Sequence, residues 1–431
     1  MSTRSVVLRM LLGAAFGGAL LLAQPVTTRA APSALYGVQD DAWLAHGPGT
    51  LEGRLDELEE MGVDVVRYTV RWNEVATRQP ASPRDHLDPA YEWEATDAVL
   101  RGLRHHRIGA VVTLLGTPAW ANGGRSANWA PTSTSAFGNF AHAAARRYSW
   151  VEFWTIWNEP NRPQWLRPTS ARTYVEKLLN PAYGEIRAVL PGAQVGGGMT
   201  APRAGSGGVS PVAWIEAMGR LHARLDAYAH HPYPSRPQTE SPWRPACARC
   251  ASITMADLER LVSLVRRTLG PERIWLTEYG YQTNPPDPFL GVSPLAQAAH
   301  VASAMRRVYA ARSVDMLIFF LVRDDDVDTG WQSGFSTASG AQKPAYTAFR
   351  LPLVAVSGGR GRVTLWGQIR PRAGPQPYRL RIFRGGRWSW LGGVRLTDAR
   401  GTLTVTVPAP AGSVIRLFSL RDRAYGLELR V

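Results

Sequence analysis

Residues 153–161 read Phe-Trp-Thr-Ile-Trp-Asn-Glu-Pro-Asn, and residues 273–280 read Arg-Ile-Trp-Leu-Thr-Glu-Tyr-Gly. Each stretch is a short apolar run typical of a buried strand, and each places a glutamate, Glu159 or Glu278, directly before turn residues. A carboxylate at the tip of a core strand is costly unless it has partners or a function. Two such tips far apart in the sequence favour one barrel that presents both acids to a single cleft.

Apolar runs of strand length recur along residues 35–321 and alternate with helical patterns. The eight predicted strands are Leu35–Val38, Val63–Tyr68, Ala110–Leu115, Val151–Trp157, Gln194–Gly198, Leu225–His230, Arg273–Thr277 and Asp315–Leu321. The seven predicted helices are Leu51–Met61, Glu92–His105, Thr134–Tyr148, Ala171–Leu190, Val212–Leu221, Thr254–Leu269 and Pro294–Arg312. Strands that alternate with helices indicate parallel pairing, so eight units predict an α/β fold, a closed (β/α)8 TIM barrel.

The alternative architecture is an open, doubly wound sheet. Such a sheet would carry a glycine-rich nucleotide loop after its first strand, and residues 36–40, Tyr-Gly-Val-Gln-Asp, do not form one. The glycines of residues 195–199, Val-Gly-Gly-Gly-Met, instead indicate close backbone approach at the rim of a barrel.

A different pattern follows Phe349. Short alternating runs separated by Gly, Pro and Asp predict a small antiparallel β-sandwich, with strands at Val363–Trp366, Tyr378–Phe383, Trp388–Leu391, Thr402–Val407 and Ser413–Phe418. The predicted domains are a signal peptide at 1–30, a catalytic barrel at 31–351 and a basic all-β accessory domain at 352–431.

The first 30 residues have the pattern of a bacterial-type secretory signal peptide. Arg4 and Arg9 supply positive charge, residues 10–23 form an apolar run, and Thr-Arg-Ala at 28–30 offers a cleavage site after Ala30. The alternative is an uncleaved membrane anchor, but the run is shorter than the roughly 20 residues that span a bilayer. We therefore expect a protein that is secreted or associated with the cell surface.

The cysteines Cys247 and Cys250 lie in a proline-rich stretch. In a cytosolic chain a C-x-x-C motif would suggest redox or metal chemistry. Export favours a disulfide between them instead. A zinc site would need a second pair of ligands, and the sequence offers none.

The positive charge is concentrated at the C-terminus. Residues 352–431 contain 14 arginines and three acids, so they account for most of the formal net charge of +15. A compositional bias toward arginine is one explanation, since the chain has only two lysines, Lys177 and Lys343. The functional alternative is attraction of this domain to an anionic cell-wall polymer. Nucleic acid is not expected as a partner, and we expect a monomer.

The carboxyl ends of the strands gather residues suited to chemistry, because such barrels build their active sites there. These residues are Asp40, Asp41, Arg67, Trp72, Trp120, Asn158, Glu159, His231, Tyr233, Glu278, Arg323 and Asp324. The acidic run at 324–328 could bind calcium through its carboxylates. An acidic loop at the rim is the simpler interpretation, and no cofactor or metal is expected.

Several of these motifs carry a resemblance to a known family. They are Trp-Asn-Glu-Pro-Asn at 157–161, Thr-Glu-Tyr-Gly at 277–280, Val-Arg-Tyr at 66–68 with Trp72, His-Pro-Tyr at 231–233, and Gln-Lys-Pro-Ala-Tyr-Thr-Ala-Phe at 342–349. Over roughly residues 34–350 the chain resembles a clan A retaining glycoside hydrolase, of the cellulase type or the β-xylosidase and α-iduronidase type.

The resemblance implies an O-glycosyl hydrolase that cleaves β bonds of a polysaccharide or oligosaccharide by double displacement. Glu159 would be the general acid and then the base, and it must carry its proton near neutral pH. Glu278 would be the nucleophile and must stay ionised, with Arg67 and Tyr233 as its partners. The expected substrate-binding residues are Arg67, Trp72, Trp120, Asn158, Trp165, His231, Tyr233, Phe320 and Arg323.

Strand eight departs from the family pattern, which usually offers a tryptophan beneath the reactive sugar. The run at 317–321 is Leu-Ile-Phe-Phe-Leu, so Phe319 or Phe320 would replace that tryptophan. The alternative function, from a different class, is a cell-wall carbohydrate-binding protein that has lost catalysis. The intact pair of acids argues against it.

Overall fold

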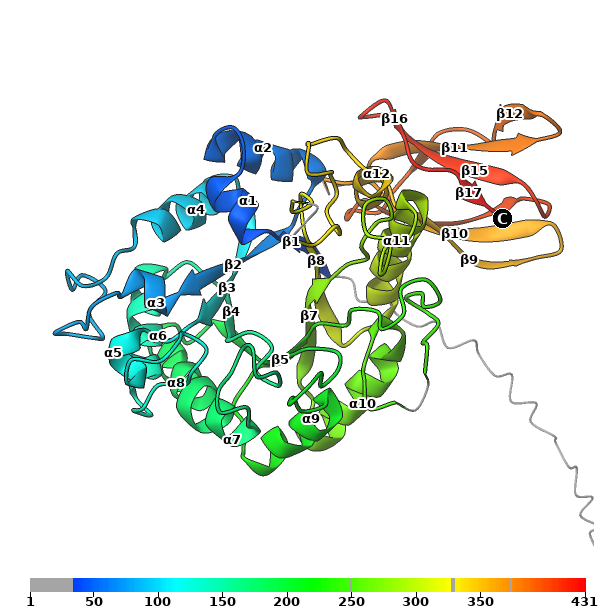
Figure 1. Ribbon diagram of the computed structural model, residues 1–431. Coiled ribbons are helices and arrows are strands. Elements are labelled where there is room, and N and C mark those ends of the chain that lie inside the picture. The colour runs from blue at the N-terminus through cyan, green and yellow to red at the C-terminus, as the bar shows by residue number, and fades with distance from the viewer. Residues whose placement is uncertain (1–33, 248–249, 327–329, 372–373) are drawn as a thin grey trace, which may run out of the picture.

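The computed structural model describes residues 34–247, 250–326, 330–371 and 374–431 (Figure 1). The predicted signal peptide lies outside these residues. Within them, no helix combines the length and the apolar character needed to cross a membrane.

Eight parallel strands close into a barrel in sequence order, which confirms the predicted (β/α)8 fold (Figure 1). They are β1 (Leu35–Gln39), β2 (Val65–Arg71), β3 (Gly109–Leu115), β4 (Phe153–Ile156), β5 (Gln194–Thr200), β6 (Ala227–His230), β7 (Arg273–Tyr279) and β8 (Val314–Phe320). Pairing of β1 with β8 closes the ring. The strands are buried on both faces, which is why they read as nearly continuous apolar runs.

Helices surround the barrel. The long ones are α2 (Leu51–Met61), α4 (Glu94–His105), α6 (Ala136–Arg147), α8 (Asn180–Val189), α9 (Pro211–Arg220), α10 (Leu258–Thr268) and α11 (Pro294–Ala310). Shorter ones are α1 (Asp41–His46), α3 (Trp72–Val75), α5 (Ala119–Asn122), α7 (Ala171–Tyr174) and α12 (Pro344–Arg350). Ser210 and Ser293 cap α9 and α11 through their hydroxyls, each directly before a proline.

Two predicted helices are divided in the structure. The run predicted at Ala171–Leu190 is α7, a π turn at Val175–Leu179 and then α8. Pro181 lies in the first turn of α8 and has no N–H to continue the α-helical pattern. The run predicted from Thr254 opens with a 3-10 turn, in which Thr254 and Asp257 form a capping box, before α10 begins.

The glycines of β5 are required by close packing along the strand, whereas the sequence pattern predicts close approach at the rim. A Cβ on Gly196 would lie 2.7 Å from the ring of Trp275, and one on Gly197 would lie 2.9 Å from Leu179. The barrel interior is filled by Trp275 and aliphatic neighbours such as Met316. The barrel is therefore a packed core whose chemistry is confined to its rim.

The C-terminal residues form the predicted antiparallel sandwich. One sheet has the order β14-β10-β9 and the other β12-β11-β15-β16. Their bounds are β9 Leu353–Gly359, β10 Arg362–Gln368, β11 Pro377–Arg384, β12 Arg387–Trp390, β14 Thr402–Pro408, β15 Val414–Ser419 and β16 Ala424–Tyr425, with short strands β13 (Arg395–Leu396) and β17 (Leu429–Arg430) at the second sheet. The sequence pattern missed β9, which ends in Ser-Gly-Gly and is largely exposed.

Arg370 joins the sandwich to the barrel. It is fully buried, its Nη2 lies 2.8 Å from Asp64 and also donates to the Gly62 carbonyl, and its guanidinium stacks over Tyr36 and Phe349. Gly62 and Asp64 precede β2, so this joint lies at the amino ends of the barrel strands. The carboxyl ends of the strands are left free to form a site.

Candidate active site

Glu159 lies on a strained turn at the end of β4. Trp157 and Glu159 have positive φ values of 69° and 36°, a region that residues other than glycine rarely adopt. Buried Asn161 holds the turn, because its Oδ1 accepts from the Ala201 N–H and its Nδ2 donates to the Val209 carbonyl, both at 2.9 Å. The Asn-Glu-Pro-Asn motif thus fixes where the Glu159 carboxylate lies.

Arg67 of β2 is the hub of the site. It is 1% exposed, and its Nη1 lies 2.5 Å from Oε1 of Glu278 on β7. Its Nη2 donates to Oδ1 of Asn158 at 2.7 Å, its Nε donates to Oγ1 of Thr113 at 2.8 Å, and Nη1 also reaches Oε1 of Gln39. A buried guanidinium with acceptors on four strand ends holds these side chains in one arrangement.

Glu278 is held in its ionised form. Burial by itself raises the pKa of this carboxyl, but nearby His231 and Arg67 outweigh burial, so the pKa lies below its ordinary value. The Tyr233 hydroxyl adds to this effect by donating to Oε2 of Glu278 at 3.0 Å. Burial, followed by the charge of Glu278, raises the pKa of Tyr233 well above its ordinary range, so Tyr233 keeps its proton for this bond.

His231 connects the two glutamates. Its Nδ1 lies 3.1 Å from Oε1 of Glu159 and 3.5 Å from Oε2 of Glu278, and its side chain is fully buried. One oxygen of each carboxylate and a nitrogen of this ring all lie within 4.8 Å of one another. Arg162 approaches the other oxygen of Glu159 at 3.8 Å. The two acids therefore face one small volume.

The adjacent His230 is structural. Its two ring nitrogens bond to Oγ1 of Thr200 at 2.8 Å and the carbonyl of Ile253 at 3.0 Å. Burial lowers its pKa to about 3, so the ring is neutral. Of the two consecutive histidines, only His231 faces the acids.

A cavity of about 470 Å³ opens beside Glu278. Its lining comes mostly from the ends of β1 and β2 and includes Gln39, Asp40, Asp41, Arg67, Thr69, Glu74, Asn158, Trp165, Phe320 and Asp325. Asn158 belongs to the lining, whereas its neighbour Glu159 does not. The space thus extends from Glu278 toward β1 and β2.

Asp40 and Asp41 shape this end of the cavity. Asp40 accepts N–H bonds from Trp43, Val322 and Arg323 at 3.0 to 3.2 Å, which ties the start of α1 to the end of β8. Burial raises the pKa of Asp40 to about 7. Burial also raises the pKa of Asp41, whose Oδ1 accepts from the Thr69 N–H.

The predicted aromatic residues divide between two places. Trp165 and Phe320 line the cavity, whereas Phe319 is 3% exposed and packs in the core. Trp72 is 1% exposed and meets Trp120 edge-on at 5.4 Å in an aromatic cluster behind the site. In the part of the chain that the structure describes, Trp72 and Trp120 contribute nothing to the cavity lining, and their substrate-binding role stays a prediction.

Trp331 is an aromatic residue of the site that the sequence pattern did not indicate. Its ring lies 5.3 Å from that of Tyr233 and 5.8 Å from that of Phe320, and it is 41% exposed. It follows the acidic run on the loop after β8, where no strand-end rule applies. Gln39 was also missed, although its position directly before Asp40 at the end of β1 could have indicated it.

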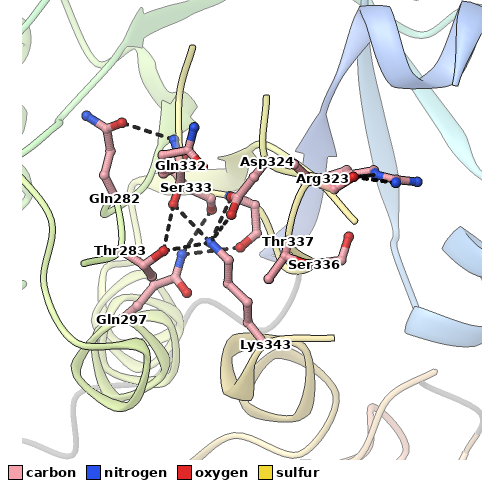
Figure 2. A network of polar contacts seen from close by, with 12 residues as sticks. Gln282, Thr283, Gln297, Arg323, Asp324, Gln332, Ser333, Ser336, Thr337 and Lys343 are labelled. Atoms are coloured by element: carbon pink, nitrogen blue, oxygen red, sulfur yellow. Dashed lines mark hydrogen bonds and ion pairs between the residues drawn. The ribbon is translucent and has the colours of Figure 1, made fainter. Parts of the chain in front are cut away.

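A buried ion pair anchors the loop that carries Trp331. Nζ of Lys343 lies 2.7 Å from the Asp324 carboxylate and donates to Oγ1 of Thr283 at 2.9 Å and the carbonyl of Gln332 at 3.0 Å (Figure 2). Burial lowers the pKa of Lys343 and raises that of Asp324, and each group opposes the shift of the other. The carboxylate of Asp324 is thus engaged by an ammonium group, which weakens the calcium alternative for the acidic run.

Arg323 points away from this network (Figure 2). Its guanidinium donates to the carbonyl of Ala338, and only its backbone N–H reaches the site region, at Asp40. Its expected role in substrate binding stays a prediction. Residues 327–329 of the acidic run lie outside the described residues.

Among the residues that the structure describes, two groups of side chains have the spacing of metal ligands. Glu159, His231 and Glu278 form one, and Glu52, Asp56 and His106 form the other on the outer surface of α2 and α4. In the first group the guanidinium of Arg67 already neutralises Glu278 at 2.5 Å, which leaves poor electrostatics for a second cation. Cys247 and Cys250 form the expected disulfide.

Solved structures share this fold. A family 39 glycoside hydrolase from Bacteroides cellulosilyticus matches with a TM-score of 0.59 at 16% identity, over 89% of this chain and 80% of that one. A glucosidase from Croceicoccus marinus matches at 0.58 and 14%, over 89% and 95%. A family 39 enzyme from Xanthomonas axonopodis matches at 0.56 and 16%, over 90% and 94%. No family model and no curated protein match the chain. The expected likeness to clan A glycoside hydrolases therefore holds at the level of the fold.

Proposed function

We propose that this protein is a retaining β-glycosidase that cleaves O-glycosidic bonds of a polysaccharide or oligosaccharide by double displacement. The observation that carries the proposal is the pair formed by Glu159 and Glu278, which have carboxylate oxygens within 4.8 Å of each other. Retaining enzymes keep their two carboxyl groups about 5–5.5 Å apart, whereas inverting enzymes separate them by about 6.5–9.5 Å. The short separation favours direct attack by one carboxylate over activation of a water between the two.

In the first step, the Glu278 carboxylate attacks the anomeric carbon as the bond to the leaving oxygen breaks. Glu159 donates its proton to that oxygen, so an alcohol leaves and a glycosyl ester on Glu278 remains. The contacts of Glu278 suit a nucleophile, because Arg67 and Tyr233 hold it ionised and fix its orientation. The Asn158 side chain, oriented by Arg67, would bind the sugar 2-hydroxyl.

In the second step, the Glu159 carboxylate removes a proton from water. The water oxygen attacks the anomeric carbon, the ester bond breaks, and Glu278 is released as the carboxylate. His231 lies within hydrogen-bond distance of Glu159 and positions it through both steps. Two inversions at the same carbon give net retention of configuration.

The cavity beside Glu278 supports a proposal for the two sides of the scissile bond. The leaving group must lie on the side of Glu159, which protonates it. The glycone therefore occupies the cavity toward β1 and β2, where Asp41, Glu74 and Asp325 offer acceptors for sugar hydroxyls. Phe320 and Trp331 provide the aromatic surface that a tryptophan on strand eight usually provides.

A panel of aryl β-glycosides and polysaccharides tests the proposal. Wild-type protein is expected to release product from at least one of them, with retained anomeric configuration in the first product seen by NMR. Glu278→Gln should lower kcat/KM more than about a thousandfold, and Glu159→Gln should lower it by roughly 10²–10⁴-fold. With an activated aryl glycoside, azide should restore turnover to Glu159→Ala as a β-glycosyl azide, because azide needs no general base.

Full activity of Glu278→Gln on every substrate that the wild type cleaves would exclude the proposed nucleophile. A first product of inverted configuration would exclude retention. Glycan binding with no release of reducing sugar from any substrate would instead favour the alternative of a carbohydrate-binding protein. Glu185→Gln, on an exposed ion pair with Arg84, is the control for a neutralised glutamate outside the site.

We also propose that the protein is exported, to the medium or the cell surface. The pattern of residues 1–30 supports export, and so does the disulfide between Cys247 and Cys250, since such bonds persist in oxidising compartments. N-terminal sequencing of the protein recovered from culture supernatant should give a chain that begins at Ala31. Recovery only from the cytosol, with the first residues intact, would contradict export.

A further inference from the structure

The outer face of the sheet β12-β11-β15-β16 alternates arginines with aromatic rings. Along β11 and β15, every second side chain packs into the sandwich core, as Leu380 and Leu417 do. The intervening side chains point outward, and the arginines and aromatic residues among them and on β12 and β16 are Arg379, Arg381, Phe383, Trp388, Trp390, Arg416, Phe418 and Tyr425. This set of eight residues is called the arginine-aromatic face. Figure 1 shows β11 and β12 on the side of the molecule remote from α5 to α9.

Cation–π contacts hold the arginines in a row. The guanidinium of Arg379 lies 4.0 Å from the Trp390 ring centroid, and Arg381 lies 5.2 Å from the same ring. Arg381 also lies 5.7 Å from the Tyr425 ring, and Arg416 lies 4.9 Å from it on the next strand. The rings therefore alternate with three cations, and the attraction between ring and cation helps to fix the positions of the guanidinium groups.

The chain provides almost no negative charge for this row. Among the described residues, neither Arg379 nor Arg381 has an acidic side chain within ion-pair distance, and Arg416 meets only Glu428, at 3.9 Å. Arg381 lies directly opposite Arg416 in the β11–β15 register. Like charges in that position destabilise a sheet. The guanidinium groups of Arg379 and Arg381 donate to neutral acceptors, the Gly392 carbonyl at 3.4 Å and the Tyr425 hydroxyl at 3.2 Å.

We propose that the arginine-aromatic face binds an extended anionic polysaccharide, with its carboxylates on the arginine row. A planar guanidinium pairs with a carboxylate through two parallel hydrogen bonds, and such pairs would relieve the repulsion between Arg381 and Arg416. Arg379 and Arg381 are two residues apart on β11, so they lie roughly 7 Å from each other. This spacing suits charges that repeat along a linear glycan. The exposed edges of Trp390 and Phe383, 39% and 36% exposed, flank the row and can contact sugar C–H groups.

Single-stranded nucleic acid fits this face less well. Proteins that bind it stack the bases on open aromatic faces, whereas here guanidinium groups already cover Trp390 and Tyr425. The face thus offers ordered positive charge rather than a stacking platform. The proposal does not depend on the glycosidase activity, because the face lies on the accessory sandwich and its binding can be measured without hydrolysis.

The test uses the full chain and a soluble linear polyuronate in affinity electrophoresis, with a neutral glucan of similar length as reference. The double variant Arg379→Gln with Arg381→Gln is expected to lose at least about tenfold in affinity for the polyuronate, the equivalent of one good charge-assisted contact. The control variant, Arg360→Gln with Arg362→Gln, removes the same charge from the turn after β9 and the first residue of β10, and it should lose less than about twofold. Arg381→Lys should weaken binding too, since an ammonium group keeps the charge without the planar pair.

Other results would overturn the proposal. They are failure of the wild type to bind the polyuronate, equal loss in the two double variants, or tighter binding of a single-stranded oligonucleotide or an anionic phospholipid vesicle that displaces the polyuronate. The melting temperature verifies that each variant folds. If the double variant does not fold, Arg416→Gln on the neighbouring strand provides a second test. Hydrolysis of a small aryl glycoside should be unchanged in all of them, so a failure here is distinct from a failure of the proposed activity.

Discussion

Arg67 in the barrel and Arg381 in the sandwich are both strand arginines, but their surroundings are opposite. Arg67 is 1% exposed and meets acceptors on Gln39, Thr113, Asn158 and Glu278. Arg381 is held between aromatic rings and has no acidic partner among the residues that the structure describes. Burial forces complete pairing of a charge, whereas rings can hold a partly exposed cation and leave its charge available to a ligand.

Removal of each arginine in turn gives the largest contrast. Arg67→Met is expected to lower the free energy of unfolding by roughly 3–5 kcal/mol, because Glu278 would stay buried without its cation. Arg381→Met should change it by less than about 0.5 kcal/mol, because its removal leaves no buried charge without a partner. Urea denaturation followed by tryptophan fluorescence measures both values. Similar losses of unfolding free energy in the two variants would contradict the prediction. They would mean that the buried Glu278 carboxylate does not depend on Arg67 as its cation.

The buried pair of Lys343 and Asp324 extends the comparison to the loop that carries Trp331. Lys343→Met alone should cost about 3 kcal/mol, since it leaves Asp324 buried and unpaired. The double variant Lys343→Met with Asp324→Asn should cost less than the single one, because neither charge remains. Arg172→Met, in an exposed helical pair with Glu176, is the matched control and should cost less than about 0.5 kcal/mol.

The joint between the two domains offers an intermediate case. Arg370 is fully buried like Arg67, but Asp64, with which it forms an ion pair, is partly exposed, and Arg370 also donates to the Gly62 carbonyl. Arg370→Met is expected to cost roughly 1.5–3 kcal/mol, the range for hydrogen bonds that involve a charged group. Differential scanning calorimetry should then show the sandwich unfolding ahead of the barrel. A single unshifted transition would mean that apolar contacts such as that of Trp366 with Tyr309 hold the joint alone.

The strand ends were predictable from the sequence because a closed barrel brings all of them to one rim. Glu159, Glu278, Arg67 and Tyr233 each follow or end an apolar run, and the structure brings them together. The contacts expected of Glu278 required only this topology, because Arg67 and Tyr233 lie at strand ends of the same rim.

The aromatic surroundings were not predictable in the same way. Trp72 follows β2 directly, but the first turn of α3 carries its ring behind the site. Trp331 enters the site on a loop whose path depends on the buried Lys343, a contact with no signature in the local pattern. Tryptophan suits both a core and a sugar platform, so composition cannot tell the two apart.

The smallest predicted effect concerns Tyr233, whose hydroxyl is the neutral partner of Glu278. Glu278 must be ionised to attack, and its lowered pKa places the acid limb of kcat/KM below the range of an ordinary carboxyl. Tyr233→Phe removes one donor to the carboxylate and leaves Arg67 in place, so the pKa of Glu278 should rise. The acid limb should move upward by up to about one pH unit, the equivalent of one hydrogen bond.

Tyr281→Phe is the matched control, because the Tyr281 hydroxyl donates to the carbonyl of Glu240 and not to either catalytic glutamate. Its acid limb should coincide with that of the wild type. A fall in kcat of Tyr233→Phe with an unmoved acid limb would mean that Tyr233 orients the nucleophile without setting its charge. His231 and the buried guanidinium of Arg67 would then hold Glu278 ionised without the hydroxyl, which would sharpen the contrast between Arg67 and Arg381, which has no acidic partner among the described residues.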